Sequence, residues 1–231
     1  MNRSMKQVKL TLNLSQQEIK GTLERYHFSK GDFSALCSFF LALNPLIDCK
    51  AFYEVIDPDK KRPEQFHFVE EEQFLAAIVT LGNPLDRLQE LYLEAQDVLS
   101  AYMIECLGLD LLSQAYEKLA GRIEAEEGLY ISRYEFLGGK YPLDKTKDIF
   151  DYFSQSEVTY NEAYMLIPQK SVAFLGKLTR EPKEICRHIC ESCHNKNCTN
   201  RIVLKKQEET REFLPYGYQR ILGKGQGWKE D

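Results

Sequence analysis

The sequence lacks several features that would assign it to common classes of protein. It contains no run of about 18 uncharged apolar residues, the length that a membrane-spanning helix needs. Its first residues lead into alternating lysine and apolar side chains, which is not the pattern of an export signal. Basic residues are not in excess, with 30 against 35 acidic residues and a net charge of −5, which argues against a nucleic-acid binder. These absences predict a cytoplasmic protein that binds neither a membrane nor a nucleic acid.

Common catalytic signatures are also missing. No Walker phosphate-binding loop, no Rossmann glycine fingerprint and no nucleophile elbow is found. His27 and His67 are isolated and are predicted to be structural, and no pair of acid and base residues stands out. We therefore expect the chemistry of this protein to come from bound cofactors.

The 231 residues have an ordinary globular composition, with 43% apolar and 28% charged residues. Apolar periodicity and capping signals predict the following elements. The predicted strands are Val8–Leu14, Ala51–Ile56, Phe74–Leu81, Leu129–Ser132, Tyr164–Ile167 and Ser171–Leu178. The predicted helices run from a capping box at Ser15–Glu18 toward Tyr26, over Phe33–Leu43, from Asn83-Pro84 onward, and over Val98–Leu107, Leu111–Ile123 and Lys145–Phe153.

The helices come in groups, and the strands are not separated by regular helical crossovers. This order predicts an α+β fold with a mixed or antiparallel sheet rather than a doubly wound parallel sheet. The composition changes near Thr179, so we expect a first domain over residues 1–180 and a small cysteine-rich segment over residues 181–231.

The seven cysteines are unevenly distributed. Three lie in apolar surroundings and are predicted to be packing residues: Cys37, Cys49 and Cys106. The other four, Cys186, Cys190, Cys193 and Cys198, fall within 13 residues. Thiolates are the usual ligands of iron–sulfur clusters and of structural zinc. Three thiols within eight residues favour a [4Fe–4S] cluster held in one loop, with zinc or unligated redox thiols as alternatives; His188 and His194 could replace one thiolate.

A long part of the chain resembles a known family. The stretch FLAAIVTLGNPLDRLQELYLEAQDVLSAYMIECLGLDLLSQAYEKLAGRI is followed by RYEFLGGKYPLDKTKDIFDYF and then by VTYNEAYMLIPQKSVAFLGKL. The order and spacing of a strand ending in Leu-Gly, a pair of helices, an arginine-led loop and a Pro–Lys–Ser–Val hairpin agree with that family. Over roughly Leu75–Leu178 the sequence resembles the reactivation (activation) domain of cobalamin-dependent methionine synthase.

The resemblance implies a clamp-like α+β domain that binds S-adenosylmethionine and presents it to cobalamin, so that inactive cob(II)alamin is reduced and methylated. In that family an Arg-x-x-x-Gly-Tyr loop holds the adenosylmethionine. Its counterparts here are Arg133, whose guanidinium can pair with the methionine carboxylate, and Gly138, Gly139 and Tyr141. The glycines would let backbone amides approach the ligand. An ungapped alignment puts Leu137 and Gly138 where Gly and Tyr belong, so the loop departs from the family pattern.

Together these features suggest a stand-alone reactivation subunit that works on a separate cobalamin-dependent methionine synthase. The cluster would pass an electron from ferredoxin or flavodoxin to the cobalamin that the partner carries. Two alternatives remain open: an iron–sulfur electron carrier for another corrinoid methyltransferase that does not bind S-adenosylmethionine, and a zinc-bearing scaffold protein.

Two further patterns occur near the end of the sequence. The spacing from Cys186 to Cys193 also matches the cluster motif of radical adenosylmethionine enzymes, but only 38 residues follow it, far too few for their barrel. After Arg201 the chain carries aromatic residues among basic ones, ending in Phe213–Arg220 and Gly223–Trp228. These aromatics could stack on bases or on a flat cofactor, but packing on the main domain is the favoured interpretation.

Overall fold

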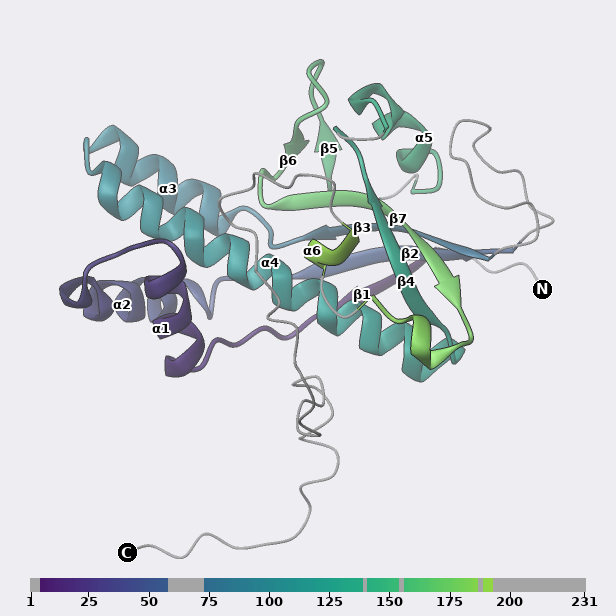
Figure 1. The fold of residues 1–231 in the computed structure, drawn as a ribbon. Helices are drawn as coiled ribbons and strands as arrows, with labels where there is room; N and C mark the ends of the chain where they lie inside the picture. The colour runs from purple at the N-terminus through teal and green to yellow at the C-terminus, as the bar shows by residue number, and fades with distance from the viewer. Residues whose placement is uncertain (1–4, 58–72, 139–140, 154–155, 187–188, 193–231) are drawn as a thin grey trace, which may run out of the picture.

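An antiparallel sheet of five strands organises the fold. In the computed structural model, the described residues are 5–57, 73–138, 141–153, 156–186 and 189–192. The sheet has the order β1-β2-β3-β7-β4 (Figure 1). Its strands are β1 (Lys6–Lys9), β2 (Lys50–Ile56), β3 (Phe74–Thr80), β4 (Tyr130–Phe136) and β7 (Ser171–Thr179). A separate hairpin pairs β5 (Thr159–Tyr160) with β6 (Leu166–Ile167). The predicted α+β class with an antiparallel sheet is confirmed.

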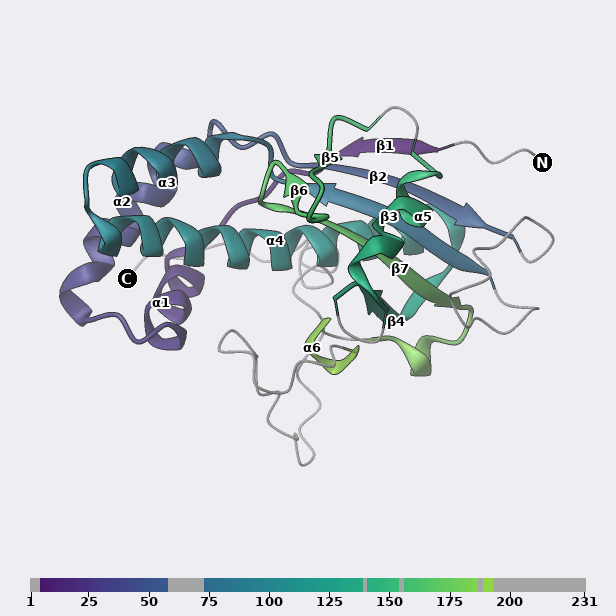
Figure 2. The ribbon, with the colours of Figure 1, turned by 90° about the horizontal axis from the view of Figure 1, so that it is seen from above.

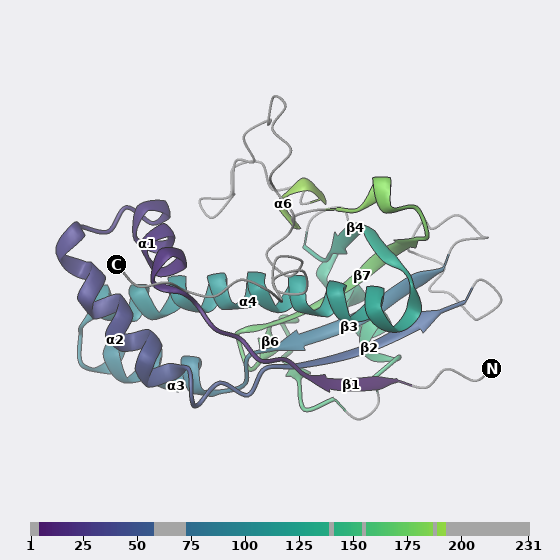
Figure 3. The ribbon, with the colours of Figure 1, turned by 90° about the horizontal axis from the view of Figure 1, so that it is seen from below.

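The helices lie on both faces of the sheet and beyond one end of it. They are α1 (Gln16–Arg25), α2 (Phe33–Leu43), α3 (Pro84–Glu94), α4 (Val98–Glu127), α5 (Thr146–Phe150) and α6 (Ile189–Ser192). Single 3-10 turns cover Lys30–Asp32, Leu143–Lys145 and Pro182–Glu184. The C-terminal half of α4 covers one face of the sheet, and α5 lies on the other (Figures 1 and 2). The first three helices and the N-terminal half of α4 form a helical lobe beyond the sheet (Figure 3).

Each face of the sheet packs its own apolar core, because side chains alternate between the two faces along a strand. Tyr53 of β2 and Phe174 of β7 belong to the first core, which α4 closes. Phe52 and Leu175, their neighbours in sequence, belong to the second core, which α5 closes through Ile149. The central strands are therefore apolar throughout, and all seven residues of β3 are buried.

Several predicted elements are confirmed closely. Ser15 caps α1 with its side chain and forms the predicted capping box with Glu18. Helix α2 covers the predicted residues Phe33–Leu43. Gly82 follows β3 with a φ of +76°, the left-handed region that favours glycine, and Pro84 occupies the first turn of α3.

The two helices predicted over Val98–Leu107 and Leu111–Ile123 are wrong, because α4 continues through them as one helix of 30 residues. Gly108 and Asp110 suggested an interruption, but each has a tertiary role. The lack of a side chain at Gly108 makes room for Leu85 and the stem of Lys170. The carboxylate of Asp110 accepts hydrogen bonds from Thr22 and Arg25 and joins α1 to α4. Packing on these residues outweighs the weak helix preference of glycine.

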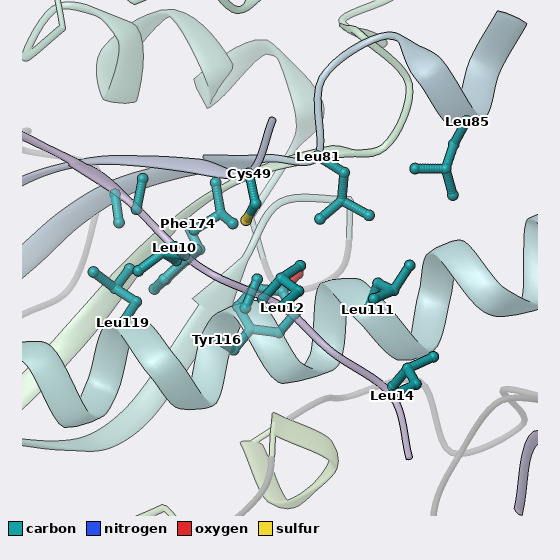
Figure 4. Packing of buried hydrophobic residues seen from close by; sticks show 14 of the residues in the cluster. Leu10, Leu12, Leu14, Cys49, Leu81, Leu85, Leu111, Tyr116, Leu119 and Phe174 are labelled. Carbon is teal, nitrogen blue, oxygen red and sulfur yellow. The ribbon is translucent and has the colours of Figure 1, made fainter. Parts of the chain in front are cut away.

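The strand predicted over Val8–Leu14 ends earlier, at Lys9. The chain stays extended, but its hydrogen bonds pass from β2 to α4. The backbone of Asn13 donates to Gln114 Oε1 at 2.8 Å, and the Gln114 amide donates back to the Asn13 carbonyl at 2.8 Å. Leu10, Leu12 and Leu14 therefore remain buried beside α4, as Figure 4 shows. The alternating pattern predicted burial correctly and sheet pairing incorrectly.

Three shorter elements also differ from their predicted bounds. Strand β4 is longer than Leu129–Ser132, and the helix predicted over Lys145–Phe153 is a 3-10 turn followed by α5. The segment predicted as a strand over Tyr164–Ile167 contributes only β6, because Tyr164 has a φ of +61° at the tip of the hairpin.

Helix α4 is long and apolar enough, by length and composition alone, to cross a membrane. In this fold 11 of its residues are buried in the protein, among them Leu107, Leu111 and Leu119. The core helix of a globular domain meets the same criteria, so the length of α4 is weak evidence for a membrane span.

Replacing Gly108 by alanine is expected to lower the free energy of unfolding by about 1–3 kcal/mol. The new Cβ would lie 2.9 Å from Leu85 Cδ2 and 3.0 Å from Lys170 Cε, and both of these residues are buried. Gly121→Ala is the matched control, because a Cβ at Gly121 meets nothing within 4 Å. This control is expected to raise the free energy of unfolding by about 0.5–1 kcal/mol. Urea denaturation measures both, and equal effects would contradict the close packing at Gly108.

Candidate functional site

The predicted ligand residue Arg133 lies on β4, an edge strand of the sheet. A β-bulge precedes it, since the register of β4 against β7 shifts between Ile131 and Arg133. Its guanidinium Nη2 lies 2.5 Å from Glu135 Oε1, and its side chain is 46% exposed against 1% for Glu135. Glu135 pairs with Leu175 of the second core, so this ion pair lies on the α5 face of the sheet.

The two described ends of the loop after β4 lie close together. Gly138 has a φ of +85°, and its backbone N–H donates to the Tyr141 carbonyl at 2.9 Å. The Tyr141 ring is buried in the second core. Gly138 lies five residues beyond Arg133, or about 16 Å along an extended strand, so the guanidinium must reach along β4 to approach the loop. Gly139 lies outside the described residues.

The start of the cysteine-rich segment lies against β4. The backbone N–H of Cys186 donates to the carbonyl of Ile131 at 2.9 Å, and Ile189 of α6 packs on the first core. Burial, with Cys186 as a smaller contribution, raises the pKa of Tyr134 on the same strand. Cys186 and Cys190 are both partly buried. The described start of the segment, up to α6, thus lies beside the strand that carries Arg133 and Glu135 (Figure 3).

The remaining proposed ligands, Cys193 and Cys198, and also His188 and His194 lie outside the described residues. Within the described part of the chain, no three metal-ligating side chains come together. The boundary predicted at Arg180 stays a prediction; β7 ends one residue before it.

A cavity that the sequence did not predict lies at the opposite end of β7. It has a volume of about 180 Å³ and is lined by Asp48, Thr80, Gly82, Asn83, Glu157 and Pro168. Lys50 Nζ bridges its two carboxylates, at 2.8 Å from Asp48 and 2.6 Å from Glu157. Hydrogen bonds from Lys50 and Lys9 lower the pKa of Asp48. The cavity therefore offers carboxylates that are already paired with lysines.

The cavity and Arg133 are far apart in the fold. Thr80 of the cavity pairs with Ser171 at the start of β7, whereas Arg133 pairs with Lys177 six residues later, a separation of about 20 Å. No sequence motif joins the residues of this cavity, which come from four distant segments. Gly82 and Pro168 enter the sequence analysis only as parts of the family resemblance, and nothing there places them at a cavity.

Comparisons with known proteins identify the fold. No family model matches the sequence, and no curated protein matches it. Among solved structures, a crystal structure of the MetH reactivation domain bound to AdoHcy superposes with a TM-score of 0.53. The match covers 76% of this chain and 79% of that chain, at 12% sequence identity.

The chain has the fold of a methionine synthase reactivation domain. The resemblance seen in the sequence is thus confirmed at the level of the fold. At 12% identity the likeness is one of architecture, and the residues that hold a ligand have to be argued from this chain.

Proposed function

We propose that this protein is a reactivation subunit for a cobalamin-dependent methionine synthase and that it acts on a separate partner protein. In this proposal it binds S-adenosylmethionine (AdoMet) and supports the reductive methylation of cob(II)alamin held by the partner. The single observation that carries the proposal is the fold, shared with a reactivation domain whose structure contains AdoHcy, the product that AdoMet leaves after methyl transfer.

The charges of the chain suit such a ligand. AdoMet carries a carboxylate at one end of its amino acid part and two cationic groups, the ammonium and the sulfonium. Arg133 is half exposed on β4, and Glu135 engages its Nη2, so donors of its five-donor fork remain for a ligand carboxylate. Asp48 and Glu157 at the cavity lie about 20 Å from Arg133, too far to face the ammonium of a ligand whose carboxylate is bound there. We assign the ligand carboxylate to Arg133, on the strand that leads into the loop with Gly138, Gly139 and Tyr141.

The cysteine segment relays the electron in this proposal. Reduction of cob(II)alamin takes one electron and gives cob(I)alamin, which then takes the methyl group of AdoMet and releases AdoHcy. Reduced ferredoxin or flavodoxin provides the electron, and a [4Fe–4S] cluster on Cys186, Cys190, Cys193 and Cys198 would relay it, since cluster potentials extend to about −700 mV. The spacing of the cysteines and the contact of Cys186 with β4 support this role.

The deciding experiment is re-methylation of an inactivated partner synthase under anaerobic conditions. The mixture contains the synthase as cob(II)alamin, AdoMet and reduced flavodoxin, with or without this protein. We expect methylcobalamin, followed by its absorption spectrum, to form together with one AdoHcy per cobalamin only when the protein is present. Cys190→Ser is expected to lose iron and most of this activity, whereas Cys37→Ser, an isolated cysteine of α2, keeps both. Equal rates with and without the protein would contradict the proposal.

Calorimetry and metal analysis distinguish the alternatives. A brown protein with iron and acid-labile sulfide that fails to bind AdoMet or AdoHcy, with and without the partner, would favour the electron carrier. One zinc per chain in a colourless protein would favour the scaffold and leave the fold unaffected.

A further inference from the structure

The helical lobe exposes most of the large apolar side chains on the described surface. Of the 11 such residues, seven belong to the lobe: Leu41, Leu46, Leu91, Leu93, Val98, Leu99 and Tyr102. Five of these lie where α3 ends and α4 begins, namely Leu91, Leu93, Val98, Leu99 and Tyr102, and we call them the apolar tip. Val98 is 66% exposed and Leu91 is 60% exposed. Scattered apolar residues are normal on a surface, but several exposed ones at the junction of two helices are a candidate contact site.

The apolar tip is surrounded by acidic residues. From Leu88 to Tyr102 the chain contains three acidic residues and no basic one, so this stretch carries a charge of −3. Glu90, Glu94 and Asp97 are exposed among the residues of the tip. An occupant that suits this surface is therefore apolar and positively charged.

The chain itself contains such a segment. Phe213–Lys229 carries three basic residues, Arg220, Lys224 and Lys229, and no acidic one, giving a charge of +3. The same 17 residues include seven large apolar or aromatic side chains: Phe213, Leu214, Tyr216, Tyr218, Ile221, Leu222 and Trp228. The segment is thus both apolar and positively charged, which matches the apolar tip and the acidic residues around it.

The connecting chain is long enough for the segment to reach the tip. Phe213 lies 21 residues after Ser192, where the described residues end, and 21 extended residues span up to about 70 Å. The 30 residues of α4 are about 45 Å long, which spans the distance from the sheet to the far end of the lobe (Figure 2). The connecting chain is therefore long enough for Phe213–Lys229 to reach the apolar tip.

We propose that the segment Phe213–Lys229 docks on the apolar tip of its own chain. The apolar side chains of the segment cover Leu91, Val98 and Leu99, and its basic residues face Glu90, Glu94 and Asp97. This contact is separate from the proposed function, because it involves neither Arg133 nor the cysteine segment.

Trp228 makes the contact measurable, because it is the one tryptophan of the chain. In the full-length protein we expect its fluorescence emission to lie to the blue of the emission in denaturant and to resist quenching by acrylamide. Leu99→Lys and Leu91→Lys replace exposed side chains and should shift the emission toward the denatured value while the helical circular dichroism is unchanged. Met165→Lys, an equally exposed apolar residue on the β5–β6 hairpin, is the matched control and should leave the emission unchanged.

The outcomes separate the possible occupants. A shift for the two tip variants that is independent of protein concentration supports docking within one chain, and raised salt should weaken it. Emission that is already that of the denatured protein, or that ignores both tip variants, overturns the proposal. Blue-shifted emission that disappears on dilution would assign the contact to a second copy of the chain and would also overturn the proposal. Emission that shifts to the blue only when the corrinoid partner is added would assign the contact to that partner and would overturn the proposal too.

Discussion

Phe174→Ala is expected to lower the free energy of unfolding by about 3–5 kcal/mol, a large fraction of the stability of a domain. Phe174 is fully buried at the centre of β7. Its ring contacts three others, with centroid distances of 5.7 Å to Tyr116, 5.3 Å to Tyr134 and 5.8 Å to Phe136. These rings come from α4 and β4, so removing Phe174 loosens the contact between the sheet and its covering helix. Urea denaturation, followed by circular dichroism, measures the loss.

Phe174→Leu is the control for this prediction. Leucine keeps most of the buried volume and should cost less than about 1.5 kcal/mol, since volume-conserving changes are tolerated best. A loss below about 1 kcal/mol for Phe174→Ala would show that the aromatic cluster does not hold α4 to the sheet.

The fold follows from the sequence wherever local signals and tertiary packing agree. The capping box at Ser15 and the apolar stretch Phe33–Leu43 each predicted a helix whose bounds need no long-range information. The apolar stretch Phe74–Leu81 predicted a buried strand. The structure agrees, because β3 lies between two other strands and has a core on each face. At these places the local signals, namely a capping box or an apolar run with its flanking residues, are sufficient.

The wrong predictions occur where contacts with a residue distant in sequence determine the local secondary structure. Asp110 reads as a helix breaker in isolation, and only its contacts with Thr22 and Arg25 explain why it lies inside α4. Gln114 likewise takes over the hydrogen bonds of Asn13 from the sheet, which no pattern in Val8–Leu14 could predict. The residues around Arg133 follow the same rule. Glu135 was not recognised, because a glutamate in a strand looks exposed until its pairing with Arg133 and Leu175 is known.

Arg133→Ala is expected to weaken AdoHcy binding by about 10- to 100-fold, the loss of a charge-assisted pair with a carboxylate. Isothermal titration calorimetry measures the change, with Arg87→Ala on the outer side of α3 as the control for the loss of one surface arginine. Arg133→Lys should recover part of the affinity, because a lysine keeps the charge but not the planar fork.

The partner residue Glu135 allows binding and folding to be separated. Removing Arg133 leaves the buried Glu135 carboxylate without its paired guanidinium, so Arg133→Ala also lowers the free energy of unfolding. The double variant Arg133→Ala/Glu135→Gln removes the buried charge and should regain that stability while AdoHcy binding stays lost. If the double variant regains both, the arginine acts only through the stability of β4. If neither variant changes the affinity, the ligand carboxylate binds elsewhere, and the β4 edge is not the site.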